Sequence, residues 1–219
     1  MRYRCLVLDH DDTVVDSTAS IHYPCFIRYM NETRPEGFYP YTFEEYVERN
    51  FEPGIVEFFT EEVGMDGEEL KREEKYWQDY VRDKIPHAYG GIAELLRDYR
   101  QGGGLIAVAS HSFSDYIRRD YSTRGLPLPD IIYGWDMPRE LRKPSPFALL
   151  DLMERYSLSP SELLVVDDLK PGYDMARAAG VDIAAAGWAY RVPAVEDFMS
   201  RNCDYYLGSV SELRTLLGL

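Results

Sequence analysis

Two acidic residues with short spacing follow an apolar segment near the start of the sequence. Asp9 and Asp11 come directly after the run Cys5–Leu8, in the pattern D-x-D-x-T. Two carboxylates this close repel each other unless a shared proton or a cation separates them. A hard divalent ion such as Mg²⁺, which takes one or two carboxylates together with a substrate phosphate, removes that repulsion. The motif therefore predicts a magnesium-dependent site, although an Asp-rich turn after a strand would have the same sequence.

Three further polar groups stand directly after apolar runs or just before predicted helices. Ser110 follows the run Leu105–Ala109, where a hydroxyl and exposed N–H groups suit a phosphate oxygen. Lys143 precedes two prolines, which favour a fixed, non-helical position for its ammonium group. Asp167 and Asp168 end a third apolar run. A helix cap or a solvated lysine would explain any one of these signals, but not their repeated position.

The elements that must hold these residues alternate along most of the chain. Short, almost continuously apolar runs are typical of strands buried on both faces of a parallel sheet, and amphipathic segments between them predict helices. We therefore expect an α/β fold, a Rossmann-like parallel sheet with helices on both faces, whose strand ends gather the polar groups at one edge. The predicted strands cover 3–9, 105–110, 131–133, 163–167, 182–186 and 205–207, and the predicted helices cover 91–100, 114–123, 146–156, 172–179, 195–201 and 209–217.

Residues 16–86 break this alternation and form a predicted helical insert after the first strand. The segment contains 17 acidic and 8 basic residues and 14 of the 30 aromatic residues. Helical spacing of aromatic residues is clear in 43–59 and 68–81, and no stretch reads as a convincing strand. We expect a core domain of residues 1–15 and 87–219 and a separate helical domain. Its aromatic residues are expected to form a core of their own rather than a platform on which bases stack.

The composition excludes several classes of function. The 219 residues carry a net charge of −14, which argues against general binding to nucleic acid or to an anionic membrane. The N-terminal apolar run is shorter than the roughly 7 to 15 residues of a secretory signal. The three widely spaced cysteines fit reduced thiols. We expect a cytoplasmic protein, either a monomer or a homodimer, whose partner is a small molecule.

As a set, these residues resemble the four motifs of the haloacid dehalogenase-like (HAD) hydrolase superfamily. The four motifs occur in the order first acid pair, Ser110, Lys143, second acid pair, and the resemblance covers nearly the whole chain. The set of four is specific for this superfamily, although no single motif is. The insert resembles the C1 cap of the phosphoglycolate phosphatase and β-phosphoglucomutase-like branch. The sequence Trp188-Ala189-Tyr190 also resembles a loop of phosphoglycolate phosphatase-like members.

The resemblance implies a role for each motif residue. Asp9 would be the nucleophile that accepts the phosphoryl group, and Asp11 would act first as general acid and then as general base. Ser110 and Lys143 would bind phosphoryl oxygens. The cofactor Mg²⁺ would be held by acidic residues of both pairs: the Asp9 carboxylate, the main-chain carbonyl of Asp11, Asp168 and, as a further candidate, Asp167.

Three positions depart from the family pattern. Asp12 stands where the family usually has Gly, and it adds a negative charge beside the metal. Asp tolerates left-handed backbone better than most residues, so we expect the turn to survive. His111 replaces a commoner Asn and either contacts phosphate or packs in the core. Gly172 replaces the final Asp of many phosphatases, as in the phosphomutase-like pattern, and this leaves metal binding by Asp167 open.

The resulting hypothesis is a Mg²⁺-dependent phosphatase that hydrolyses a small phosphorylated metabolite through an aspartyl-phosphate. One alternative is a sugar phosphomutase, which would return the phosphoryl group to its substrate. The others are a phospho-accepting receiver domain, which has no helical insert of this size after its first strand, and a non-catalytic interaction protein. The insert must select the substrate, and its candidate anion contacts are Arg28, Arg34, Arg49, Lys71, Arg72 and Lys75.

Overall fold

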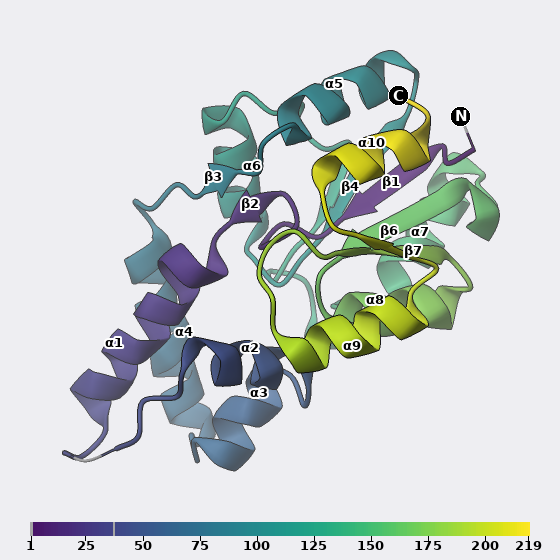
Figure 1. Ribbon diagram of the computed structural model, residues 1–219. Helices are drawn as coiled ribbons and strands as arrows, with labels where there is room; N and C mark the ends of the chain where they lie inside the picture. The colour runs from purple at the N-terminus through teal and green to yellow at the C-terminus, as the bar shows by residue number, and fades with distance from the viewer. Residues whose placement is uncertain (1, 37) are drawn as a thin grey trace. The chain divides into compact units, whose positions relative to one another are not determined.

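A six-stranded sheet, in which every neighbouring pair of strands is parallel, forms the centre of the fold. The computed structural model describes residues 2–36 and 38–219, so the predicted core and the predicted insert each contain one residue outside this range. The strand order is β5-β4-β1-β6-β7-β8 (Figure 1). All six predicted strands are present, with ends that differ by at most two residues: β1 Cys5–Leu8, β4 Leu105–Ala109, β5 Ile131–Tyr133, β6 Leu163–Asp167, β7 Asp182–Ala186 and β8 Tyr205–Leu207.

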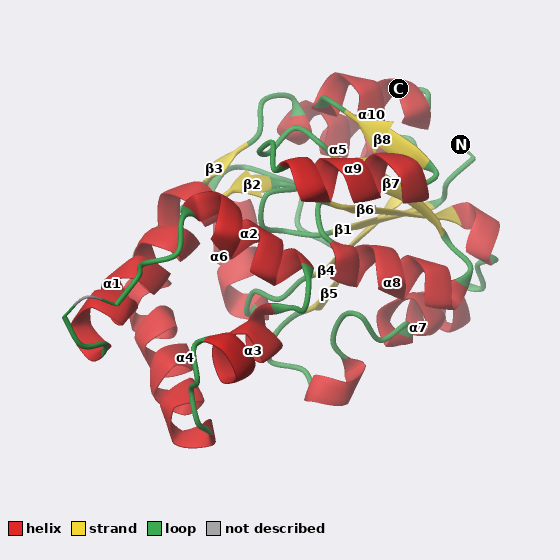
Figure 2. Ribbon diagram, turned by 60° about the horizontal axis from the view of Figure 1, so that its bottom comes forward, coloured by secondary structure: helices red, strands yellow, loops and turns green. Residues whose placement is uncertain are grey.

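Helices connect the strands and lie on both sides of the sheet (Figure 2). Each of the six predicted helices is present, and the α/β fold class is confirmed. Their bounds are α5 Ile92–Gln101, α6 Ser114–Thr123, α7 Phe147–Tyr156, α8 Lys170–Ala179, α9 Pro193–Asn202 and α10 Val210–Leu217, with short 3₁₀ turns at Arg139–Leu141 and Pro160–Glu162.

Strand β1 is buried on both faces. Leu6 and Leu8 belong to the apolar cluster that contains residues of α5, α6 and α10, whereas Cys5 and Val7 belong to the cluster that contains residues of α7 and α8. This division follows from the two-residue period of a strand. All four side chains are fully buried, which is why the strand reads as a continuous apolar run. The residue that follows β1 is therefore held by a rigid, central strand.

The chain divides into two compact units, Met1–Asp16 with His87–Leu219 and Ser17–Pro86. The second unit is helical, and its aromatic side chains, among them Phe26, Phe58 and Phe59, form a buried cluster. The prediction that these aromatic residues form their own core is confirmed. The elements are α1 Tyr23–Thr33, α2 Phe43–Phe51, α3 Ile55–Glu57 and α4 Gly67–Val81, with π-helical turns at Thr18–His22 and Phe58–Glu62.

Two local details differ from the expectation from sequence. A short antiparallel ladder pairs β2 (Val15–Asp16) with β3 (His87–Ala88). It could not be expected from sequence, because strands of two residues show no detectable alternation of apolar and polar residues. At the start of α10, the sequence Ser209-Val210-Ser211-Glu212 predicts a capping box, in which each end residue's side chain accepts a hydrogen bond from the N–H of the other. The Ser209 hydroxyl does accept from Glu212 N–H, but the Glu212 carboxylate accepts from Gly208 N–H instead, so the box is only half formed.

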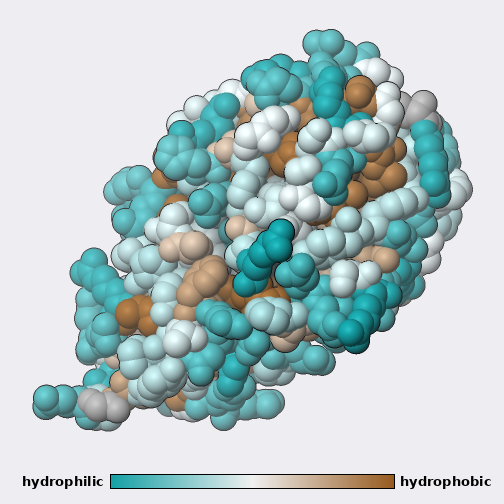
Figure 3. Space-filling model, viewed as in Figure 1, coloured by the Kyte–Doolittle hydropathy of each residue, from teal (hydrophilic) through white to brown (hydrophobic). Residues whose placement is uncertain are grey.

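The face of the molecule in Figure 3 is mostly hydrophilic, with apolar residues in separate groups. Among the described residues, the large hydrophobic side chains that are exposed are Tyr39, Leu128 and Leu150. None of the described helices is both long enough and apolar enough to cross a lipid bilayer.

Glu73 on α4 is an acid whose carboxyl is mostly shielded from water. Burial raises its pKa to about 7, and the charge of Glu74 acts in the same direction. Because this pKa exceeds the ordinary value of 4.5, the folded state binds a proton that the unfolded state releases between these two pH values. The contribution of Glu73 to the unfolding free energy is therefore expected to fall as the pH rises from 4.5 to about 7.

Glu73→Gln tests this pH dependence, since an amide cannot lose a proton. The variant should raise the unfolding free energy at pH 8 by roughly 1–3 kcal/mol and change it little at pH 4. Urea unfolding followed by circular dichroism measures both values. Glu61→Gln, at an exposed position, is the control and should have similar, small effects at the two pH values. An equal effect of Glu73→Gln at pH 4 and pH 8 would contradict the raised pKa.

Candidate active site

The predicted site residues lie at the carboxyl edge of the sheet. Asp9 directly follows β1, Ser110 directly follows β4, and Asp167 is the last residue of β6. Because β4, β1 and β6 are neighbours in the sheet, their carboxyl ends lie side by side. The parallel topology thus positions residues that are distant in sequence.

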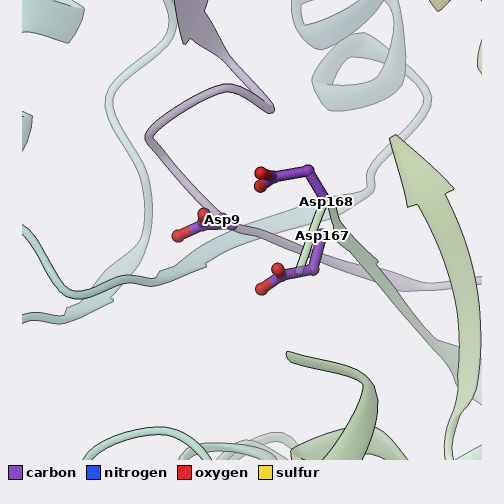
Figure 4. A group of neighbouring side chains, drawn as sticks. All are labelled: Asp9, Asp167 and Asp168. Atoms are coloured by element: carbon purple, nitrogen blue, oxygen red, sulfur yellow. The ribbon is translucent and has the colours of Figure 1, made fainter. Parts of the chain in front are cut away.

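Asp9, Asp167 and Asp168 form a cluster of buried carboxylates (Figure 4). One oxygen from each carboxylate lies within 4.8 Å of the other two. Burial raises the pKa of Asp168 well above its usual value, and the charges of Asp167 and Asp9 add to this effect. Burial also raises the pKa of Asp167, to about 6, against the opposing charge of Lys143. Such a cluster is stable in its ionised form only with positive charge close by.

Lys143 brings positive charge to this cluster. Its Nζ donates to Asp167 Oδ2 at 2.7 Å and lies 3.0 Å from Asp9 Oδ1. The lysine side chain is only 6% exposed. Burial by itself lowers the pKa of this ammonium group, but the carboxylates of Asp167 and Asp9 more than offset burial and raise the pKa above its usual value. Lys143 therefore remains protonated at neutral pH.

The donor set fits a divalent cation. When all are ionised, the three clustered carboxylates and the one ammonium group leave two net negative charges. Apart from its ion pair with Lys143, the buried Asp9 Oδ1 accepts no hydrogen bond from the described residues. Hard carboxylate oxygens are the ligands that Mg²⁺ prefers. The residues able to hold such an ion are Asp9, Asp167 and Asp168.

The Asp11 carboxylate contacts Ser112, a residue outside the acidic cluster. Ser112 Oγ donates to Asp11 Oδ2 at 2.6 Å, and Ser112 is buried. From sequence, Ser112 is a candidate only for capping α6, because nothing indicates a contact across 101 residues. The start of α6 is instead capped by Asp136, whose Oδ1 accepts from the N–H and the hydroxyl of Ser114.

Ser110 and His111 lie directly after β4. The Ser110 hydroxyl oxygen is buried and accepts from Ser112 N–H at 3.1 Å. His111 Nε2 donates to the main-chain carbonyl of Lys143 at 3.1 Å, and its ring meets Trp135 edge-on. Burial lowers the pKa of His111 to about 4, and the charge of Lys143 acts in the same direction. His111 is thus a neutral ring that joins the segment after β4 to the segment that carries Lys143.

Asp12 occupies left-handed backbone in the turn after β1. Its φ is +56°, in the region that Asp and Asn tolerate better than most residues. The turn is closed by hydrogen bonds from Asp12 N–H to the Val15 carbonyl and from Val14 and Val15 N–H to the His10 carbonyl. The prediction that Asp preserves this turn in place of Gly is confirmed. Because Asp12 is buried, its charge also contributes to raising the pKa of Asp168.

Gly172 leaves room for the Asp167 side chain. A Cβ atom at position 172 would lie 2.1 Å from the Asp167 carboxyl carbon. In that space Asp167 accepts from Leu169 N–H at Oδ1, at 2.9 Å, and from Lys143 at Oδ2. Both oxygens of Asp167 are therefore bound by donors of the protein. The glycine that departs from the common phosphatase pattern is what makes this arrangement possible.

Two hydroxyl groups hold the Asp168 carboxylate. Thr13 Oγ1 donates to Oδ1 at 3.3 Å, and Tyr190 Oη donates to Oδ2 at 2.5 Å. Trp188 Nε1 donates to the Thr13 carbonyl at 3.2 Å. Burial and the charge of Asp168 raise the pKa of Tyr190 well above its usual value, so the hydroxyl keeps its proton. From sequence, Trp188 and Tyr190 stand out only as part of a loop and not as site residues.

Comparison with known proteins identifies the family. The model of the haloacid dehalogenase-like hydrolases matches residues 6–186. The chain belongs to this family. A curated phosphoglycolate phosphatase from Vibrio parahaemolyticus is 30% identical over 132 residues, which cover 59% of this chain and 56% of that protein. Another, from Aquifex aeolicus, is 25% identical over 190 residues, covering 85% and 86%. The HAD chain thus spans little more than half the length of the Vibrio relative.

Solved structures share the HAD fold over nearly the whole chain. A predicted phosphatase from Clostridium acetobutylicum has a TM-score of 0.80 at 18% identity, with all of both chains covered. A CbbY variant from Rhodobacter sphaeroides in complex with xylulose-1,5-bisphosphate has a TM-score of 0.73 at 20% identity, with 96% of each chain covered. The resemblance drawn from the motifs is therefore confirmed at the level of family and fold.

The basic residues of the helical unit are mostly paired with its own acids. Of the six basic residues considered from sequence as anion contacts, five have a carboxylate partner. Among the described residues, the sixth, Arg72, has no ion pair. The five pairs are Arg28–Glu32, Arg34–Glu69, Arg49–Glu62, Lys71–Glu68 and Lys75–Asp79. The four pairs that have an exposed member contribute little to stability. The Arg34–Glu69 pair is instead mostly buried, and the described residues give Arg34 Nη2 no hydrogen-bond partner.

His10, between the two motif acids, forms a buried pair with Asp120 on α6. Nε2 donates to Asp120 Oδ2 at 3.1 Å, and both residues are at most 3% exposed. Arg119 donates to the other oxygen of Asp120 at 2.8 Å. The imidazole also stacks on Tyr121, with ring centroids 5.9 Å apart. This pair joins the first motif of the chain to α6. It could not be predicted from sequence, because the two residues are 110 positions apart.

Gly172→Ala is expected to displace the Asp167 carboxylate, because the added methyl group and the carboxyl group cannot occupy the same space. The unfolding free energy should fall by about 1–3 kcal/mol, measured by urea unfolding. Gly67→Ala is the matched control, since a Cβ there meets nothing within 4 Å. A stability of Gly172→Ala equal to that of the unmodified protein would disprove the close approach.

A double-mutant cycle with His10→Phe and Asp120→Asn should reveal coupling in the unfolding free energy of about 1–3 kcal/mol. Each single change leaves a buried polar group with one hydrogen bond fewer, so each should destabilise the protein. Tyr121→Phe serves as a control and should not destabilise the protein, because the described residues give the buried Tyr121 hydroxyl no partner to lose. Strict additivity of the two single effects would show that the pair contributes nothing.

Proposed function

We propose that the protein is a Mg²⁺-dependent phosphatase that hydrolyses a small phosphorylated metabolite through an aspartyl-phosphate on Asp9. The observation that carries this proposal is the environment of Asp9 at the end of β1. Its carboxylate lies 3.0 Å from Lys143 Nζ and within 4.8 Å of oxygens of Asp167 and Asp168. Membership of the haloacid dehalogenase-like hydrolases supports the same chemistry.

In the first step, an Asp9 carboxylate oxygen attacks the phosphorus of the substrate. The bond from this oxygen to phosphorus forms as the bond to the substrate oxygen breaks, and Asp11 gives its proton to the leaving oxygen. The hydrogen bond from Ser112 fixes Asp11 Oδ2 and thereby the direction of proton transfer. Lys143 reduces the repulsion between the attacking carboxylate and the phosphate.

In the second step, water attacks the phosphorus of the aspartyl-phosphate. Asp11, now ionised, takes a proton from this water as the bond between phosphorus and the Asp9 oxygen breaks. Inorganic phosphate leaves, Asp9 returns as a carboxylate, and Asp11 is again protonated. In each cycle Asp11 thus gives one proton to the leaving oxygen and takes another from water.

Ser110 and Lys143 are proposed to bind the phosphoryl oxygens. His111 is proposed to hold the Lys143 segment in place through its hydrogen bond to the Lys143 carbonyl. When bound, Mg²⁺ supplies positive charge against the phosphoryl oxygens and the clustered carboxylates. Its proposed ligands are the Asp9 carboxylate, the main-chain carbonyl of Asp11 and Asp168. Asp167 is proposed to serve mainly as the partner of Lys143, because its Oδ2 accepts a hydrogen bond from the charged ammonium group at 2.7 Å.

Phosphoglycolate is the first substrate to test, because the curated relatives are named phosphoglycolate phosphatase. Sugar phosphates come second, since the CbbY structure contains a sugar bisphosphate. We propose the helical unit Ser17–Pro86 as the cap domain that selects among such substrates. Its separate apolar core supports this assignment, because a unit that folds around its own core can vary without disturbing the phosphoryl-transfer groups.

Phosphate release from these compounds, with Mg²⁺ and with a chelator, tests the proposal. Activity should require Mg²⁺. Asp9→Asn should lower kcat by about 10³-fold or more, since the amide is not a nucleophile. Asp11→Asn should lower it by about 10²–10⁴-fold, the usual range for loss of a general acid. Asp174→Asn, which alters an ion pair on α8, is the control and should retain activity.

A folded Asp9→Asn variant that keeps full activity would remove Asp9 as the nucleophile. Conversion of a sugar phosphate to its isomer without phosphate release would favour a phosphomutase. A stable phosphoaspartate without turnover would favour a receiver-like function. Each outcome is distinguished by the same assay combined with analysis of the products.

A further inference from the structure

The loop between β7 and α9, residues 187–192, carries two aromatic hydrogen-bond donors that point to different motifs of the site. Tyr190 Oη donates to Asp168 Oδ2 at 2.5 Å, and Trp188 Nε1 donates to the main-chain carbonyl of Thr13 at 3.2 Å. Thr13 in turn donates through its hydroxyl to Asp168 Oδ1 at 3.3 Å. Together with the backbone that joins Trp188 to Tyr190, these contacts form a closed ring that includes Thr13 and Asp168.

This ring fixes both oxygens of the Asp168 carboxylate. A carboxylate with no partners can rotate about its terminal torsion, which is broad in energy. In Asp168 the Thr13 and Tyr190 hydroxyls define the plane of the group, and the residue is 6% exposed, so bulk water does not readily replace either donor. Of the two contacts, the Tyr190 hydrogen bond is the shorter by 0.8 Å.

The loop is itself held in place by packing. A Cβ atom at Gly187 would lie 2.5 Å from the Tyr206 ring, so the backbone passes directly over that side chain on β8. At the other end of the loop, Val192 is 2% exposed. Asp168 and Tyr190 also line a small cavity whose other walls are mostly apolar, with Glu196 and Tyr206 as the polar members. Few groups there could replace the Tyr190 hydroxyl.

We infer that Tyr190, supported by Trp188, is a positioning residue that orients Asp168 for a divalent cation and thereby sets the affinity for that cation. The inference rests on the proposed function, because it takes Asp168 as a metal ligand. Hydrogen bonds to metal-binding carboxylates typically contribute about 10–100-fold to metal affinity, through orientation of the ligand rather than direct contact. Tyr190 touches neither the reacting phosphorus nor Asp9 in this scheme.

Isothermal titration calorimetry of the full chain with MgCl₂ alone tests this inference without any substrate. Tyr190→Phe removes only the hydroxyl and should raise the Kd for Mg²⁺ by about 10-fold or more. Trp188→Phe removes the indole N–H and should raise it by a smaller factor, since it acts through Thr13. Tyr206→Phe is the matched control, a tyrosine of the same cavity, and should leave the Kd unchanged.

The kinetic result expected for Tyr190→Phe is a higher Mg²⁺ requirement, with kcat at saturating Mg²⁺ within about threefold of the unmodified enzyme. Thermal unfolding of each variant without metal separates this effect from a loss of folding. The inference is wrong if Tyr190→Phe folds and binds Mg²⁺ with a Kd within twofold of that of the unmodified protein. If Tyr190→Phe does not fold, an unchanged Kd for Mg²⁺ in Trp188→Phe overturns the inference instead. Asp168→Asn distinguishes the two levels: normal Mg²⁺ binding by that variant would remove the proposed metal site itself.

Discussion

Three buried carboxylates and one buried ammonium group meet at the carboxyl edge of the sheet, and the polar contacts of the core are arranged around this charge. Lys143 lies between Asp9 and Asp167, at 3.0 and 2.7 Å. One lysine cannot neutralise three carboxylates, and burial makes the excess charge costly. When all three carboxylates are ionised, the deficit amounts to two positive charges, which one divalent cation would supply. The charge imbalance that opposes folding would then favour binding of such a cation.

The parallel topology makes this concentration of charge possible. Strand β1 lies between β4 and β6, so the first acid, the hydroxyl of Ser110 and the second acid pair leave three adjacent strands at one edge. Each strand is buried on both faces, and its last residue has little freedom to move. Short contacts between loops then complete the arrangement: Ser112 holds Asp11, His111 holds the Lys143 segment, and Tyr190 holds Asp168.

The strands, the helices and the acid cluster could be predicted because they depend on local signals. An apolar run such as Leu163–Val166 predicts a buried strand by itself, and the residue after such a strand must lie at the sheet edge. The supporting contacts could not be predicted, since each joins side chains far apart in sequence whose types are common. Ser112 carries no pattern of its own, and Tyr190 stands out only as part of a loop that gives no sign of a contact with Asp168. Asp120 resembles an ordinary polar residue of an amphipathic helix.

The net charge of −14 and a site for an anionic phosphate are compatible because they act over different ranges. Exposed charges are screened within about 10 Å at 0.1 M salt, whereas buried groups act at contact. In the helical unit, most of the basic side chains considered as anion contacts are paired with carboxylates of the same unit. That unit therefore has little free positive charge with which to attract phosphate. In the proposed function, attraction of the phosphoryl group comes from Lys143, a bound cation and the groups at the strand ends. Substrate selection by the proposed cap would then depend on shape and polarity rather than on charge.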